Sequence, residues 1–218
     1  MSRVAAFFDM DRTLLAVNSG TLWLRHLRAH GEIGLGQTLH ALVWLVGYHL
    51  SLVDMDAVTA QAALTVKGQS EENLRARCDE WFRRDVVPYI TAAGRAAVEH
   101  HRREGHVLAL LSGSSPYGAG PLARLLDVPY VLSNRLEVVD GVFTGVMIRP
   151  MCWGPGKVTR AEELARAEDV DLEASWFYTD SYSDLAMLER VGHPVVVNPD
   201  PRLRRLARRR GWPIQRWR

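Results

Sequence analysis

The chain has 218 residues, of which 47% are hydrophobic and 24% charged, and its formal net charge is +2. That length accommodates one large domain, or a core with an inserted subdomain. The small net charge predicts no nucleic-acid partner. Two cysteines, Cys78 and Cys152, without a CxxC pair favour a reducing, cytoplasmic compartment. We expect no signal peptide, because a strand pattern begins almost at the first residue.

Residues Val4–Phe8 are all apolar, which predicts a strand buried on both faces. Asp9 and Asp11 follow it, with Thr13 two residues beyond. Alternate residues of a strand point the same way, so both carboxyl groups should lie on one side of the strand end. Two like charges that close repel unless a cation separates them, and Mg²⁺ is the usual cation of an all-oxygen site. On this stretch alone, a simple turn after the strand is an equal alternative.

Residues 16–88 carry helical patterns and no strand signal. Asn18 or Ser19 can cap a first helix, whose apolar residues repeat at three and four. Pro88 should end the block. The apolar window Leu39–Val53 is too short and too interrupted to span a bilayer, so we expect no membrane-spanning segment. The other helices predicted in this block are Leu39–Leu52, Met55–Thr65 and Ser70–Val86.

From Thr91 onwards, helices and strands alternate, which predicts a parallel sheet with helices on both faces. The predicted helices are Thr91–Glu104, Pro121–Leu126, 154–167, Asp184–Arg190 and most of 202–218. The predicted strands are His106–Ser112, Val128–Leu132, Trp176–Thr179 and Val195–Val197, with a hairpin of Leu136–Val139 and Val142–Val146 around Asp140–Gly141. The arginine-rich C-terminal residues are interpreted as a solvated helix face, with contact to an anionic surface as the alternative.

Polar residues stand where several of these strands end. Asp9, Ser112 and Asp180 each follow an apolar run. In parallel sheets the ligand site lies at the carboxyl ends of the strands, so these residues should meet there. Gly156-Lys157 lacks the earlier glycine and the hydroxyl residue of a phosphate-binding P-loop, and Ser112 lies outside a G-x-S-x-G elbow.

Together these residues resemble the haloacid dehalogenase (HAD) superfamily. Its D-x-D-x-T signature matches Asp9–Thr13, its second motif matches Ser112, its third matches Lys157, and its acidic fourth motif matches Asp180–Asp184. All four stand in the order of the superfamily. The resemblance implies an α/β fold with a Rossmann-like parallel sheet core, formed by residues 1–15 and 89–218. It also implies an inserted all-α cap over residues 16–88.

Finer details are similar to subfamily IB, which includes phosphoserine-phosphatase-like and histidinol-phosphate-phosphatase-like hydrolases. These details are Ser181–Asp184 after Asp180, Val196–Asp200, and Arg209–Pro213. True phosphoserine phosphatases usually carry a glutamate where this chain has Asn18. That departure puts phosphoserine in doubt as the substrate.

The resemblance implies Mg²⁺-dependent hydrolysis of a small phosphorylated metabolite. Asp9 would attack phosphorus and form an aspartyl-phosphate. Asp11 would protonate the leaving alcohol and then activate water. The metal would be held by Asp9, Asp180 and the backbone carbonyl of Asp11.

The remaining motif residues would bind the phosphoryl group or position its ligands. Lys157 would add a fixed positive charge, while Ser112 and the Gly113 amide would donate hydrogen bonds to phosphoryl oxygens. Asp184 would orient Lys157 or a metal-bound water. Asn18, at the cap entrance, would contact the substrate.

Other functions remain open at this point. A phosphotransferase or mutase would use the same aspartyl-phosphate. A non-catalytic phosphate-binding protein would need only some of these motif residues. Asp11 argues against the last, because an acid/base beside the nucleophile serves turnover. The apolar window Leu39–Val53 could also recruit a lipid phosphate. The sequence leaves the physiological substrate, the oligomeric state, the pathway and the role of the basic C-terminal residues undetermined.

Overall fold

The structure is a computed structural model in which residues 2–34, 36, 61 and 63–217 are described. The predicted helix Leu39–Leu52 and the first part of Met55–Thr65 lie outside the described residues. Within the described part, no helix combines the length and the apolar character that crossing a membrane requires.

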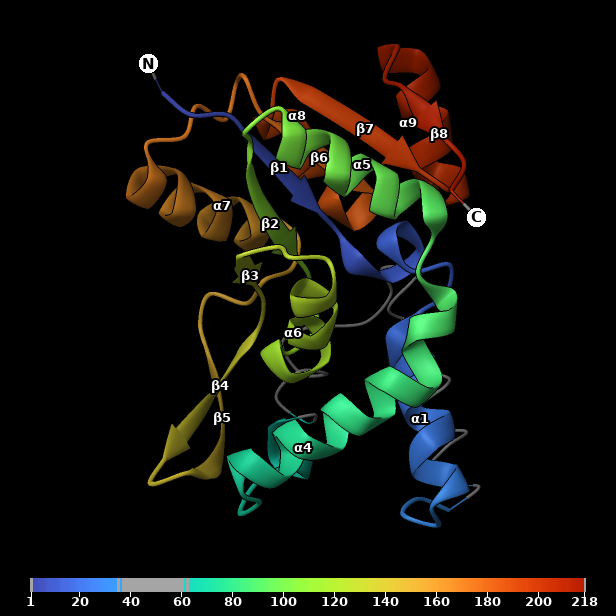
Figure 1. Ribbon diagram of the computed structural model, residues 1–218, viewed down its shortest axis with the longest axis vertical. Helices are drawn as coiled ribbons and strands as arrows, with labels where there is room; N and C mark the ends of the chain where they lie inside the picture. Colours follow the sequence, from blue (N-terminus) through green and yellow to red (C-terminus); the bar gives the residue numbers. More distant parts are fainter. Residues whose placement is uncertain (1, 35, 37–60, 62, 218) are drawn as a thin grey trace.

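A six-stranded parallel sheet forms the centre of the molecule, in the order β3-β2-β1-β6-β7-β8 (Figure 1). The first strand, β1, lies between β2 and β6, and its four residues are fully buried. The predicted parallel sheet is therefore confirmed. Its strands are β1 (Ala5–Phe8), β2 (Val107–Leu111), β3 (Tyr130–Leu132), β6 (Trp176–Thr179), β7 (His193–Val197) and β8 (Ile214–Gln215).

Helices cover both faces of this sheet. Ala6 and Phe8 of β1 belong to an apolar cluster with residues of α5 and α6, whereas Ala5 and Phe7 belong to a second cluster with α7, α8 and α9. Alternate strand residues thus supply both faces, which explains why the strand has no polar position. The helices are α5 (Ala92–Arg103), α6 (Pro116–Leu125), α7 (Pro155–Glu168), α8 (Leu185–Arg190) and α9 (Pro201–Arg210), with a short turn η4 (Tyr182–Asp184) before α8.

The C-terminal residues differ from the prediction. The basic helix α9 ends at Arg210, because Gly211 takes a left-handed conformation (φ 69°) that closes helices. The chain then returns to the sheet, where β8 pairs with β7, and buries Trp217. The helix predicted over most of 202–218 is therefore confirmed only as far as Arg210.

Helix α6 also differs from the prediction, because it begins five residues before the predicted start at Pro121. Ser115 caps it by accepting a hydrogen bond from the Gly118 amide, and Pro116 occupies the first turn, where no amide donor is needed.

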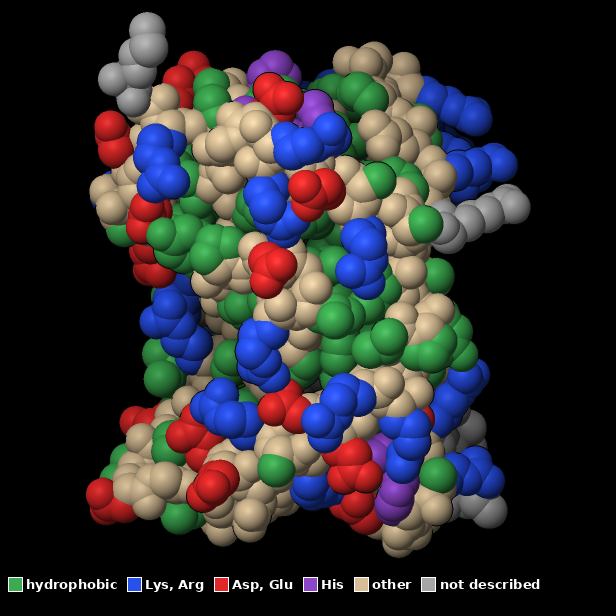
Figure 2. All heavy atoms as spheres, viewed as in Figure 1, with side chains coloured by type: hydrophobic (Ala, Val, Ile, Leu, Met, Phe, Trp, Pro, Cys, Tyr) green, Lys and Arg blue, Asp and Glu red, His purple; other side chains and the backbone are tan. Residues whose placement is uncertain are grey.

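Basic and acidic side chains are interspersed over the face drawn in Figure 2, with basic groups gathered toward α9.

The described part of the 16–88 block is helical. It begins with α1 (Ser19–Ala29), which Asn18 caps by accepting the Thr21 amide. Ser70 caps α4 (Glu71–Trp81), and two short turns follow, η2 (Phe82–Val86) and η3 (Val87–Tyr89). Where this block meets the core, Leu15 forms a bridge with Ile90. The two connecting segments are thus held side by side.

The hairpin of β4 (Arg135–Val139) and β5 (Val142–Ile148) runs beside α4 (Figure 1). Its β5 backbone exchanges hydrogen bonds with the helical block, from the Gly68 amide to the Phe143 carbonyl and from the Phe143 amide to the Gln69 carbonyl. The Phe143 side chain packs in a cluster with Leu74 and Cys78. In sequence the hairpin lies within the segment 89–218 that was predicted as core, but it packs on the helical block.

Two histidines, His101 and His106, lie close together where α5 packs against the sheet. His101, on α5, is buried, with Nε2 2.8 Å from the Tyr178 hydroxyl and Nδ1 2.7 Å from Nδ1 of His106. Burial, together with the charge of His106, lowers the pKa of His101 to about 4. The folded protein therefore holds His101 neutral at a pH where an unfolded chain would bind a proton.

Acid should destabilise the protein through this histidine. The unfolded chain protonates near the ordinary pKa, so the stability contributed by neutral His101 is lost as the pH falls from about 6.5 towards about 4. Urea unfolding at about pH 7.5 and about pH 5 should show wild type losing about 1–2 kcal/mol more than His101→Gln. Exposed His30, at the end of α1, provides the control, because His30→Gln should keep the wild-type dependence. Equal losses in wild type and His101→Gln would contradict the assignment.

Candidate active site

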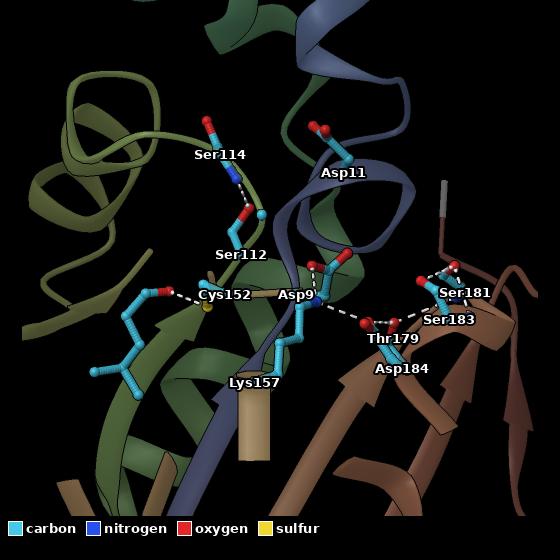
Figure 3. Close-up of polar contacts among 12 residues, drawn as sticks. Asp9, Asp11, Ser112, Ser114, Cys152, Lys157, Thr179, Ser181, Ser183 and Asp184 are labelled. Atoms are coloured by element: carbon cyan, nitrogen blue, oxygen red, sulfur yellow. Dashed lines mark hydrogen bonds and ion pairs between the residues drawn. The ribbon is translucent and has the colours of Figure 1, made fainter. Parts of the chain in front are cut away.

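Asp9 lies at the carboxyl end of β1 and contacts a lysine that also contacts Asp184. Lys157 Nζ donates to Asp9 Oδ1 at 2.8 Å and to Asp184 Oδ2 at 2.7 Å, so the ammonium lies between the two carboxylates (Figure 3). Thr179, the last residue of β6, donates to the same Asp184 oxygen at 2.6 Å. The structure thus brings together the first, third and fourth sequence motifs.

Burial dominates the electrostatics of this group. It raises the pKa of Asp9 to about 7, although the Lys157 charge pulls that pKa down. For Lys157, burial favours the neutral amine, but the carboxylates of Asp184 and Asp9 outweigh it and hold the pKa well above its usual range. The lysine therefore stays charged while the nucleophile candidate is poorly solvated.

Asp180 follows β6 and adds a further carboxylate. Burial, followed by the charges of Asp9 and Asp184, raises its pKa well above the ordinary value. Asp9 and Asp184 contact the buried ammonium of Lys157, and the nearby charge of Asp180 adds to theirs, so a divalent cation would offset the repulsion among the three carboxylates. In the described chain no three acidic, histidine or cysteine side chains are grouped to hold a metal. Two carboxylates plus a backbone carbonyl would suit a hard cation that keeps several waters.

Asp11 is turned towards the helical block rather than towards Lys157 (Figure 3). Its Oδ1 accepts the Ser19 amide at 2.8 Å, and its Oδ2 accepts the Asn18 side-chain amide at 3.1 Å. Burial raises the pKa of Asp11, while the hydrogen bond from Ser19, at the start of α1, lowers it. The turn η1 (Met10–Leu14), which carries Asp11, bends sharply at Arg12, whose φ is 55°.

The side chain of Asn18 is therefore hydrogen-bonded to two residues of the protein, Thr21 and Asp11. Its oxygen caps α1 and its amide donates to Asp11. This arrangement gives Asn18 a role in positioning Asp11, and the predicted contact with the substrate stays a prediction.

Ser112 and Gly113 lie beside this group, after β2. The Ser114 amide donates to the Ser112 hydroxyl at 3.2 Å, which leaves the hydroxyl proton available to another acceptor. Asn134 holds this loop: its amide donates to the Gly113 carbonyl at 2.7 Å, and its oxygen accepts the Cys152 amide at 2.7 Å. The loop is thereby tied to the segment that leads into α7 and Lys157.

Sequence reasoning missed three positioning residues. Asn134 joins the Ser112 loop to the α7 entrance, Thr179 holds Asp184, and Asn198 donates from its side chain to the Arg12 carbonyl at 3.0 Å. Thr179 and Asn198 stand at or just after strand ends, where the other motif residues also stand. That position was the one available signal for both: Asp184 lies only five residues from Thr179, whereas the Arg12 carbonyl lies 186 residues from Asn198.

The chain is similar to known proteins over most of its length. A family model for haloacid dehalogenase-like hydrolases matches residues 6–189. The chain belongs to this family. The HAD hydrolase is 33% identical over 218 residues to phosphoserine phosphatase SerB1 of Mycobacterium tuberculosis, covering 98% of this chain and 71% of the relative. It is 28% identical to the histidinol-phosphatase of Neisseria meningitidis serogroup C, with 96% of each chain covered.

Among solved structures, a Bordetella pertussis Tohama I protein of unknown function has a TM-score of 0.89 and 27% identity, with 99% of both chains covered. The predicted family and α/β fold of this HAD hydrolase are therefore confirmed. Its similarity to two phosphatases supports the predicted enzyme class.

Proposed function

We propose that this HAD hydrolase is a Mg²⁺-dependent phosphomonoester hydrolase that acts through an aspartyl-phosphate on Asp9. The observation that carries the proposal is the pair of bonds from Lys157 to Asp9 and Asp184 at the carboxyl end of the sheet. A fixed cation there would attract a phosphate dianion to a carboxylate that otherwise repels it.

In the proposed reaction, an Asp9 oxygen attacks phosphorus and the bond to the leaving alcohol breaks. Asp11 gives its proton to that alcohol, then takes a proton from the water that hydrolyses the aspartyl-phosphate and restores Asp9. Asp9, Asp180 and the carbonyl of Asp11 would hold Mg²⁺, whose charge offsets the repulsion between carboxylate and phosphate.

The other residues would fix the phosphoryl group. Lys157 would neutralise one oxygen, while the Ser112 hydroxyl and the Gly113 amide would donate to others. Asp184 and Thr179 would keep the lysine in place. Residues 16–88 would form the cap, residues 1–15 and 89–218 the core, and the substrate would be a small phosphorylated metabolite. Both cysteines are free thiols, in keeping with the proposed cytoplasmic location.

Changing Asp11 tests the proposed proton shuttle. Asp11→Asn should form the phospho-enzyme slowly and hydrolyse it at least about 100-fold more slowly than wild type, because an amide acts neither as a general acid nor as a general base near neutral pH. Acid quenching with radiolabelled substrate measures both rates, and an added alcohol acceptor reveals any phosphotransferase activity. Equal dephosphorylation rates in the variant and wild type would contradict the role of Asp11.

A further inference from the structure

A cavity of about 800 Å³ lies between the helical block and the phosphate end of the site. Gly113, Ser114 and Ser115 line it on the side of the core. Ser19, whose amide holds Asp11, lines it beside α1. The cavity therefore begins where the phosphoryl group and the acid/base are proposed to lie, and it extends away from them into the helical block.

The wall formed by the helical block is mainly apolar and aromatic. Trp23 and Trp81 meet edge to face, with ring centroids 5.2 Å apart. Leu24 and Leu27 extend this wall along α1, and Leu74 contributes from α4. Trp81 and Leu74 are buried, and the other residues of this wall are half-buried. Such a wall stabilises apolar groups in proportion to the area that they remove from water.

Only two charged residues are among the described residues that line the cavity, and they neutralise each other. Arg77 donates to Glu32 at 2.5 Å, and its guanidinium also lies 5.7 Å from the Trp23 ring centroid. The described lining thus offers no unpaired carboxylate to an ammonium group and no unpaired cation to a carboxylate. A zwitterionic leaving group such as serine would lose water there without gaining a counter-charge.

We infer that the leaving group of this enzyme is an uncharged, largely apolar alcohol. This inference rests on the proposed function and names the substrate class of the same site. The phosphoryl group binds beside Lys157, and the alcohol extends over Leu24 and Trp23. Substrate preference then follows from burial of the alcohol rather than from ion pairing.

The first test compares n-alkyl phosphates from methyl to hexyl with O-phosphoserine and phosphoethanolamine, all assayed with Mg²⁺. kcat/KM should rise about threefold to fourfold for each added methylene group, because each is buried against the apolar wall. Hexyl phosphate should exceed O-phosphoserine at least about 100-fold.

A flat alkyl series, or a preference for O-phosphoserine or phosphoethanolamine, would overturn the inference and leave the proposed function standing. Hydrolysis of none of these esters, with p-nitrophenyl phosphate also untouched, would overturn both.

Two leucine variants locate the effect in the cavity. Leu24→Ala should lower kcat/KM for hexyl phosphate about tenfold and leave methyl phosphate unchanged, because only the longer chain reaches this side chain. Leu64→Ala is the matched control, since Leu64 lies in the same helical block, is 52% exposed and is not among the residues lining the cavity. Equal effects of the two changes on hexyl phosphate would overturn the assignment of this wall.

Breaking the ion pair between Arg77 and Glu32 should change the preference in the opposite direction, towards a charged leaving group. Arg77→Met leaves the Glu32 carboxylate unpaired, so the ratio of kcat/KM for phosphoethanolamine to that for hexyl phosphate should rise about threefold to tenfold. The double variant Arg77→Met/Glu32→Gln should return this ratio to the wild-type value. A ratio that Arg77→Met does not change would overturn the inference that the neutralised pair excludes charged leaving groups.

Discussion

Replacing Asp9 with asparagine should abolish turnover, lowering kcat by at least about 10⁴-fold. The amide cannot attack phosphorus as a carboxylate does. Asp9 is the carboxylate at the end of β1 that contacts Lys157, so no second carboxylate stands ready there to replace it. The fold should survive, because Lys157 keeps its bond to Asp184. Steady-state assays give the loss of kcat, and urea unfolding gives the stability.

The variant should be as stable as wild type or more so. Burial raises the pKa of Asp9 to about 7, which means that its ionised form is held against a desolvation cost that asparagine avoids. Asp127→Asn is a matched control: Asp127 is exposed and has a φ of 50°, which asparagine accepts readily, so activity should not change. Activity of Asp9→Asn within tenfold of wild type would remove Asp9 as the nucleophile.

Replacing Lys157 with methionine should cost both activity and stability. Without the ammonium, the buried carboxylates of Asp9 and Asp184 lose their shared partner, and breaking such a buried pair costs about 3–5 kcal/mol. Loss of the fixed positive charge should also lower kcat/KM at least about 10³-fold. Denaturant unfolding and steady-state kinetics measure the two losses separately.

A second change separates these effects. Adding Asp184→Asn to Lys157→Met removes one of the two unpaired carboxylates, so part of the lost stability should return. Activity should not return, because the positive charge beside the phosphate is still missing. If the double variant regained activity, the loss in Lys157→Met would be a folding defect and the proposed role of the lysine would be wrong.

The sequence by itself determined the strands of the sheet other than β8, their order of appearance and the motif residues at their ends. Residues Ala5–Phe8 could be identified as a buried strand from the sequence. A strand buried on both faces has no polar position, and the local sequence displays this property. Asp9, Ser112 and Asp180 were found for the same reason, since each ends such a run. The carboxyl edge of a parallel sheet then brought them together without further information.

Only the tertiary structure decided which other side chains hold the site. Asn134 binds Gly113 and Cys152, and Asn198 binds the Arg12 carbonyl, a residue 186 positions earlier. These partners are distant in the chain, so no local pattern indicates them.

The end of the chain and the packing of the hairpin were decided in the same way. Residues Ile214–Gln215 join the sheet as β8 because β7 offers a free edge, although their arginine-rich surroundings predict a helix. Phe143 packs with Leu74 on the helical block rather than in the core. Hydrogen bonds and apolar burial between distant segments form only after the chain has folded, and their free energy outweighs the local preferences that a sequence pattern records.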